Sequence, residues 1–129
     1  MVVDTNVFVA AGFNEGSASA RILESARAGE FAIRWNQRTR GETQRILSQI
    51  PPLSWSRVAA LFLPELEITA PLDTGPFDFV KGEVDREFVA LADASNSTLV
   101  SSDDDLLGPR SRLPVRVFSP SEFLSWWLR

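Results

Sequence analysis

The chain has 129 residues, 44% of them hydrophobic and 23% charged, which is typical of one globular domain spanning residues 1–129. It contains no cysteine, histidine or tyrosine, so a disulfide framework, a thiolate or imidazole metal site, a cysteine nucleophile and a histidine base are all excluded. Any metal or acid–base chemistry must use carboxylates, which favour hard cations such as Mg²⁺ and Mn²⁺, although the net charge of −4 argues mildly against a nucleic-acid partner.

The opening stretch from Val2 to Val9 places an acid, a hydroxyl and an amide between two apolar runs. It predicts a short buried strand that delivers Asp4 to its carboxyl end, where ligands bind in open α/β sheets. A carboxylate is well placed there for chemistry and badly placed for packing. The alternative is structural, because aspartate is favoured at the start of a helix and Asp4 would then cap the next one.

Hydrophobic spacing and turn residues predict several elements between residues 12 and 64. Ile22, Leu23 and Ala26 share one helical face, Asn36 suits a helix start, and the Pro51–Pro52 pair ends the helix before it. In chain order we expect a loop over 12–16, a helix over 17–28 followed by Gly29, a short strand over 31–35, a helix from Asn36 to about Gln49 that carries Glu42, and a short helix from Ser54 to Pro64.

The second half of the chain continues the alternation of strands and helices. In chain order we expect an extended stretch over 66–70, an irregular stretch over 71–79, a helix over 84–94, a strand over 98–101, a turn at 108–109, a strand over 115–118 and a final helix capped by Ser119, Pro120 and Glu122. Asp85 falls in the first turn of its helix, where a carboxylate also meets the positive end of the helix dipole. This order predicts an α/β fold around a mostly parallel sheet.

The basic residues are almost all arginine, since Lys81 is the single lysine among 13 basic residues. Arginine suits bidentate contact with phosphate. Candidates for a phosphate-binding rim are Arg38, Arg45, Arg110 and Arg112. The alternative is that these arginines are solvated surface charges or pair with the chain's own acids.

Four acids stand at element ends or on helix faces near them: Asp4, Glu42, Asp85 and Asp103. Asp4 and Asp103 each follow a short hydrophobic strand, and the carboxyl ends of parallel strands lie on one edge of a sheet. Clustered carboxylates repel one another unless a cation lies among them. A divalent ion resolves that repulsion and activates water for attack on a phosphodiester. The pattern therefore predicts a carboxylate metal site.

With these motifs in order, the chain resembles the PIN domain family, the fold of many metal-dependent ribonucleases. The resemblance covers nearly the whole chain. It consists of Val2–Val7 around the first acid, Arg40–Leu47 around Glu42, Asp85–Ala92 around the third acid and Leu99–Leu107 around the fourth. The nearest subgroup is that of the toxin components of bacterial toxin–antitoxin pairs. The resemblance implies a three-layer α/β/α fold with a mostly parallel central sheet.

The resemblance also implies a role for each acid. Asp4, Asp85 and Asp103 would hold Mg²⁺ or Mn²⁺, and Glu42 would complete the catalytic pocket. Supporting polar residues would be Thr5, Asn6 and Asp105. Arg38, Arg45, Arg110 and Arg112 would then contact RNA.

By the same resemblance the chain is expected to be a Mg²⁺- or Mn²⁺-dependent endoribonuclease acting as a toxin. Its expected partners are an RNA substrate, an antitoxin protein and a second copy in a homodimer. No apolar run is long enough to cross a bilayer and nothing resembles a signal peptide, so a cytoplasmic location is expected.

Other readings of the same residues fit less well or remain open. A haloacid-dehalogenase-type phosphatase needs an aspartate where this chain has Asn6, and a receiver domain needs a lysine near the site, whereas the one lysine is Lys81. The alternative that stays open is a PIN-like domain with weak or no catalysis that acts as an RNA- or protein-binding module.

Overall fold

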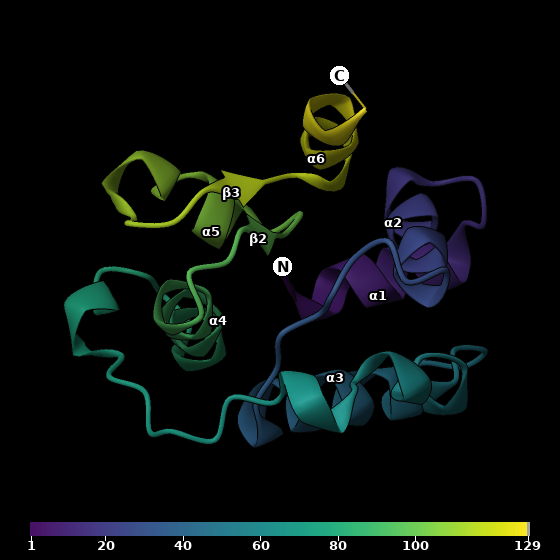
Figure 1. Cartoon of the computed structure of the whole chain (residues 1–129), viewed down its shortest axis with the longest axis horizontal. Coiled ribbons are helices and arrows are strands. Elements are labelled where there is room, and N and C mark those ends of the chain that lie inside the picture. Colours follow the sequence, from purple (N-terminus) through teal and green to yellow (C-terminus); the bar gives the residue numbers. More distant parts are fainter. Residues whose placement is uncertain (129) are drawn as a thin grey trace.

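The structure is a computed structural model that describes residues 1–128, and it is mixed α/β with six α-helices and a small three-stranded parallel sheet (Figure 1). The elements are β1 (Val2–Val3), α1 (Thr5–Phe13), α2 (Ala18–Arg27), α3 (Gln37–Gln49), α4 (Glu83–Ala94), β2 (Leu99–Val100), α5 (Asp104–Leu107), β3 (Val117–Phe118) and α6 (Pro120–Trp127). Short 3₁₀ turns lie at Trp55–Arg57, Ala59–Leu61, Pro64–Leu66, Gly75–Phe77 and Arg110–Arg112. Within residues 1–128, the helices are all too short or too polar to cross a membrane.

The sheet has the strand order β1-β2-β3, and both pairs are parallel. Val2 and Val3 lie opposite Leu99 and Val100 in a parallel pair, so the strands preceding Asp4 and Asp103 are neighbours in the sheet. Because parallel neighbours end on the same edge, the two acids leave the sheet at one place. The α/β class and the parallel sheet are confirmed.

The strand predicted over residues 31–35 is wrong, because this segment is extended but makes only isolated pairings. The Met1 amino group donates to the Ala32 carbonyl at 2.8 Å, the Arg34 N–H donates to the Met1 carbonyl at 2.8 Å, and Trp35 forms a single parallel bridge with Glu67. The segment therefore runs beside β1 on the side away from β2. Its overlap with each neighbour is about one residue, too little to form a ladder.

With the 32–35 segment counted beside β1, the order in which the chain adds strands to the sheet region reverses between β1 and β2. From β1 the chain passes first to the 32–35 segment on one side, and later to β2 and then β3 on the other side. In open α/β sheets such a switch point leaves a crevice at the carboxyl ends of the two central strands. Asp4 and Asp103 follow those two strands.

Alternate strand residues face two separate apolar clusters, as the period of two of a β-strand requires. Val3 and Val100 belong to a cluster that includes Phe8, Ile22 and Leu47, from α1, α2 and α3. The opposite cluster is built on Val2, Leu99 and Val117 and includes residues of α4 and α5. Both faces of the short sheet are therefore covered, which explains why both residues of each strand are apolar.

The helix starts were predicted better than the first helix itself. Asn36 and Ser119 cap α3 and α6, each in a capping box, and Ser17 caps α2. Helix α1 was expected only under the alternative in which Asp4 caps a helix, because its apolar residues lie all around the helix and leave no amphipathic period. Contacts with α2 and α3 explain that composition, since α1 packs against both helices.

Candidate metal centre

Asp4 lies where β1 meets α1 and has two structural roles at once. It is the N-cap of α1, and its Oδ1 accepts a hydrogen bond from the Thr5 N–H at 2.7 Å. Its Oδ2 accepts a hydrogen bond from the Ser101 hydroxyl at 2.7 Å. The side chain is buried, with only 4% of the residue exposed. The capping role considered as the alternative is therefore real, and it does not displace Asp4 from the acidic cluster.

Asp103 lies three residues beyond the end of β2, where it is the N-cap of α5. Its Oδ1 accepts from the Asp105 N–H at 2.9 Å, and its own N–H donates to the Ser101 hydroxyl oxygen at 3.0 Å. Ser101 is fully buried. Its hydroxyl links the two strand-end acids directly, because it donates to the Asp4 carboxylate and accepts from the Asp103 backbone N–H. This link holds the two carboxylates on the same edge of the sheet.

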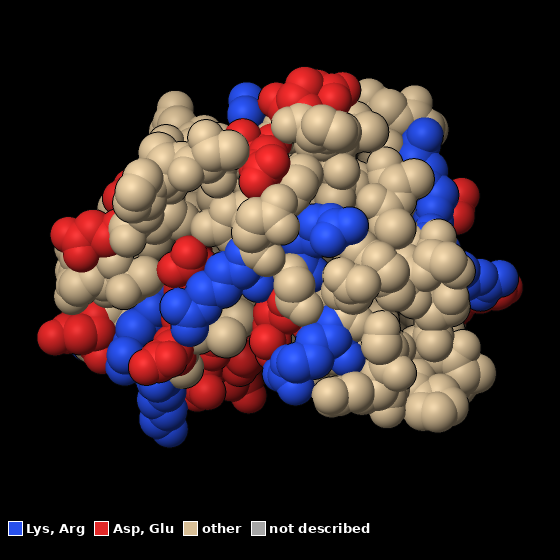
Figure 2. All heavy atoms as spheres, turned by 90° about the horizontal axis from the view of Figure 1, so that it is seen from below, with Lys and Arg blue, Asp and Glu red and all other residues tan. Residues whose placement is uncertain are grey.

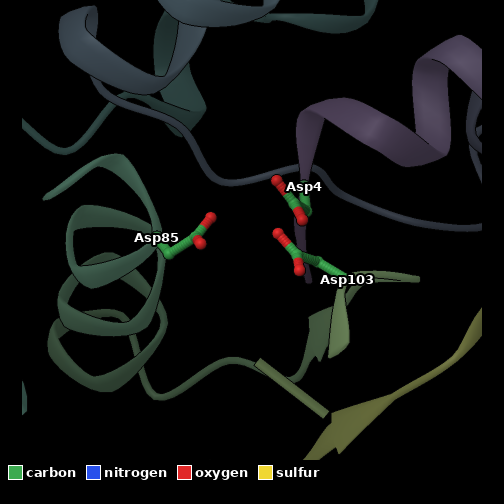
Figure 3. Close-up of side chains that lie close together, drawn as sticks. All are labelled: Asp4, Asp85 and Asp103. Carbon is green, nitrogen blue, oxygen red and sulfur yellow. The ribbon is translucent and has the colours of Figure 1, made fainter. Parts of the chain in front are cut away.

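Asp85 enters the cluster from the first turn of α4, with its carboxylate pointing toward those of the other two acids (Figure 3). The approach to this helix is held by Arg86, whose guanidinium donates to the carbonyls of Val80 and Asp78. At the helix start, Gly82 leaves room for the carboxylate, because a Cβ there would lie 3.0 Å from the Asp85 Oδ2.

One carboxylate oxygen from each of Asp4, Asp85 and Asp103 lies within 4.8 Å of the others. Burial raises the pKa of Asp4 to about 6, although its hydrogen bonds from Ser101 and Thr5 oppose the shift. Burial and the neighbouring charges of Asp4 and Asp103 raise the pKa of Asp85 to about 7. Three acids whose charges repel in a partly buried site would be relieved by a cation.

Glu42 and Asp105 lie near this trio without joining it. The Glu42 charge contributes to the raised pKa of Asp4, but the Glu42 carboxylate is held by Arg45, which donates to both of its oxygens at 2.7 and 3.3 Å. Asp105 contributes charge to the raised pKa of Asp85. The structure thus brings together three of the four predicted acids and leaves the fourth at the margin, paired with an arginine.

Thr5 and Asn6, two of the predicted supporting residues, attach the start of α1 to neighbouring segments. The Thr5 hydroxyl lies 2.9 Å from the buried Thr43 hydroxyl and so joins α1 to α3. The Asn6 Oδ1 accepts a long hydrogen bond, 3.4 Å, from the Ser102 N–H. Thr5 and Asn6 therefore connect the start of α1 to α3 and to the segment between β2 and α5.

The four arginines predicted to rim the site each have a partner within the chain. Acidic and basic side chains lie interspersed on the face seen in Figure 2. The partners are Glu83 for Arg38 at 3.4 Å, Glu42 for Arg45 at 2.7 Å, Glu122 for Arg110 at 2.7 Å, and the ring of Phe79 for Arg112 at 4.0 Å. Three of the four thus pair with acids of the chain, as the alternative reading expected.

Ser101 and Thr43 were not predicted from the sequence as residues of the site. Ser101 had a usable signal, because it is the first polar residue after β2 and so stands at the same edge as Asp103. Thr43 had none, since a threonine in the middle of a polar helix is ordinary until a second hydroxyl lies against it.

The donor set of this site is all oxygen, which fits a hard divalent cation, and two of its three acids stand at a switch point of the sheet. Comparison of the chain with protein-family models, with curated proteins and with solved structures found no match.

Proposed function

We propose that this chain is a PIN-like, Mg²⁺- or Mn²⁺-dependent endoribonuclease with a three-layer α/β/α fold, acting as the toxin of a toxin–antitoxin pair. The observation that carries the metal-dependent chemistry is the convergence of Asp4, Asp85 and Asp103 from three separate elements on one crevice. The order and spacing of the four acidic motifs, together with the resemblance they create, support RNA as the substrate.

Three carboxylates fit a divalent cation because they offer oxygen ligands at mutual distances that one ion can bridge. Asp4 keeps free lone pairs beside its bonds from Thr5 and Ser101, since each carboxylate oxygen can accept more than one bond. A bound cation would supply charge for the phosphodiester and lower the pKa of the attacking water.

The other residues of the site hold the acids and their helices in place. Ser101 holds Asp4 and the start of α5 in register, and Thr5 with Thr43 fixes the start of α1 against α3. Without a cation, the raised pKa values of Asp4 and Asp85 leave part of the cluster protonated near neutral pH.

The test is a cleavage assay with Mg²⁺ or Mn²⁺ on structured and unstructured RNA, with Asp4→Asn as the inactive control. We expect metal-dependent internal cleavage that the substitution abolishes. Metal binding without cleavage of any RNA would instead favour the catalytically inactive binding module. Cleavage that persists in Asp4→Asn would remove this cluster from the reaction.

A further inference from the structure

Helix α4 opens with three acids at alternate positions, Glu83, Asp85 and Glu87. Glu83 and Glu87 are four residues apart, so they share one face of the helix. Asp85 is turned by about 200° from each of them around the helix axis, because two residues cover a little more than half a turn. The outer two acids therefore lie on the opposite side of α4 from the acid that belongs to the metal centre.

Both outer acids contact the start of α3. The side chain of Asn36, the N-cap of α3, donates from its Nδ2 to the Glu87 Oε1 at 3.0 Å. Arg38 makes a longer and exposed contact with Glu83, at 3.4 Å. Asn36 is only 9% exposed, and its Oδ1 accepts from the Thr39 N–H at 2.9 Å. Because the Oδ1 is held by the helix that it caps, the Nδ2 has a fixed direction toward Glu87.

The same helix also contacts the other side of the metal centre. Thr43 follows Asn36 by about two turns of α3, a distance of about 10 Å along the axis. Its buried hydroxyl lies 2.9 Å from the Thr5 hydroxyl, and the Thr5 N–H donates to the Asp4 carboxylate. One continuous helix thus connects the residue beside Asp4 to the helix that carries Asp85.

We propose that Asn36 and Glu87 are positioning residues whose hydrogen bond fixes the rotation of α4, and with it the direction of Asp85, so that the metal centre favours Mg²⁺ relative to Ca²⁺. This inference rests on the metal binding of the proposed function, but not on RNA as its substrate. Mg²⁺ needs near-ideal octahedral ligands at about 2.1 Å, whereas Ca²⁺ accepts flexible geometry at about 2.3–2.6 Å. A carboxylate that is free to swing therefore costs the smaller ion more.

The experiment titrates the metal-free chain with Mg²⁺ and, separately, with Ca²⁺ in a calorimeter, without RNA. Glu87→Ala removes the acceptor, and Asn36→Ser removes the donor while keeping a favoured N-cap residue. Glu87→Gln removes only the charge, because its side-chain oxygen still accepts from Asn36. Asp93→Ala, exposed on the same helix, is the matched control. Urea unfolding in chelator measures the stability of every variant.

We expect Glu87→Ala and Asn36→Ser to lower the affinity for Mg²⁺ about tenfold or more and that for Ca²⁺ less than about threefold. Glu87→Gln and Asp93→Ala should keep the ratio of the two affinities within about twofold of the parent.

Equal loss for both ions would leave Asn36 and Glu87 with a purely structural role and overturn the proposal. So would a loss in Glu87→Gln as large as that in Glu87→Ala, because the charge and not the hydrogen bond would then be responsible. A parent that binds no Mg²⁺ overturns it too. Mg²⁺ binding with the expected ratios but without cleavage of any RNA would leave this inference standing and count against the ribonuclease alone.

Discussion

Carboxyl groups in the acidic crevice, formed by Asp4, Asp85 and Asp103, and in the Arg110–Glu122 ion pair have pKa values shifted in opposite directions. At the crevice, burial raises the pKa of Asp4 to about 6, and burial and neighbouring acids raise the pKa of Asp85 to about 7. At the β3 edge, hydrogen bonds from Arg110 and from the Ser119 backbone lower the pKa of Glu122 to about 2. The difference is that the crevice acids are buried beside other acids, whereas Glu122 is exposed and has a positive neighbour.

This contrast shows where the chain leaves charge uncompensated. Glu24, Glu42, Glu83 and Glu122 each form an ion pair with an arginine, whereas Asp4, Asp85 and Asp103 face one another. Perturbed carboxylates gathered in a crevice mark candidate functional sites. The crevice therefore differs from these four ion pairs in bringing three carboxylates together with no basic partner, which is the situation that a cation corrects.

The largest expected effect tests whether the crevice differs from ordinary surface acid. Asp85→Asn should lower metal-dependent RNA cleavage about a thousandfold, or ~4 kcal/mol in transition-state free energy, because it removes one of three ligands. Asp93→Asn, on the same helix and exposed, is the matched control and should retain activity. Equal loss in both variants would mean that helix stability, and not the crevice, controls the rate.

The second effect is a dependence of stability on pH in the metal-free protein. The folded-state pKa values of Asp4 and Asp85 lie above the ordinary value of 3.8, so folding favours their protonated forms. The free energy of unfolding should therefore fall as pH rises from about 4 to about 7, with Asp4 contributing at most about 3 kcal/mol and the half-buried Asp85 less. Urea unfolding in chelator measures the slope.

Asp4→Asn sharpens this test, since asparagine retains a capping oxygen and removes the charge. The variant should be more stable than the parent at about pH 8 and should show a flatter pH profile. Asp103→Asn is expected to raise metal-free stability at that pH in the same direction. If both variants are less stable than the parent across the range, capping outweighs repulsion at these positions.

The third effect is stabilisation by metal. Millimolar-range Mn²⁺ or Mg²⁺ should raise the free energy of unfolding by roughly 1–3 kcal/mol through mass action. Thermal melts with and without chelator report it, and Asp4→Asn should remove most of the shift. Glu122→Gln is the control and should leave the shift intact, because its carboxylate lies at the β3 edge. A melting temperature that does not respond to metal would count against the site.

The smallest effect concerns the ion pair between Arg110 and Glu122. Glu122→Gln should lower the free energy of unfolding by at most about 1 kcal/mol, because the pair with Arg110 is solvent-exposed. Since the pKa of Glu122 is lowered, its stabilisation is present above the ordinary value of 4.5 and lost as pH falls towards about 2. Denaturant curves at neutral and acid pH check this, and a larger effect at neutral pH would indicate a structural role beyond the capping box of α6.

Much of the fold was predictable from local signals. The caps at Ser17, Asn36 and Ser119 and the glycine at Gly29, which has a φ of 80°, are read directly from side-chain chemistry. The strand at residues 31–35 was mispredicted, because an apolar extended segment does not reveal how few residues its neighbours can pair with. The helix α1 escaped prediction because burial on several sides erases helical periodicity.

For the site, the sequence by itself determined that only carboxylates could hold a metal and that Asp4 and Asp103 each follow a short strand. The tertiary structure decided which acids converge. It brought Asp85 across the crevice, left Glu42 to Arg45, and put Ser101 between the two strand-end acids. Strand ends are local features with a common direction in a parallel sheet, so they can be inferred from the chain. The partner of a helical side chain depends on how helices pack, and that is set by contacts between residues far apart in sequence.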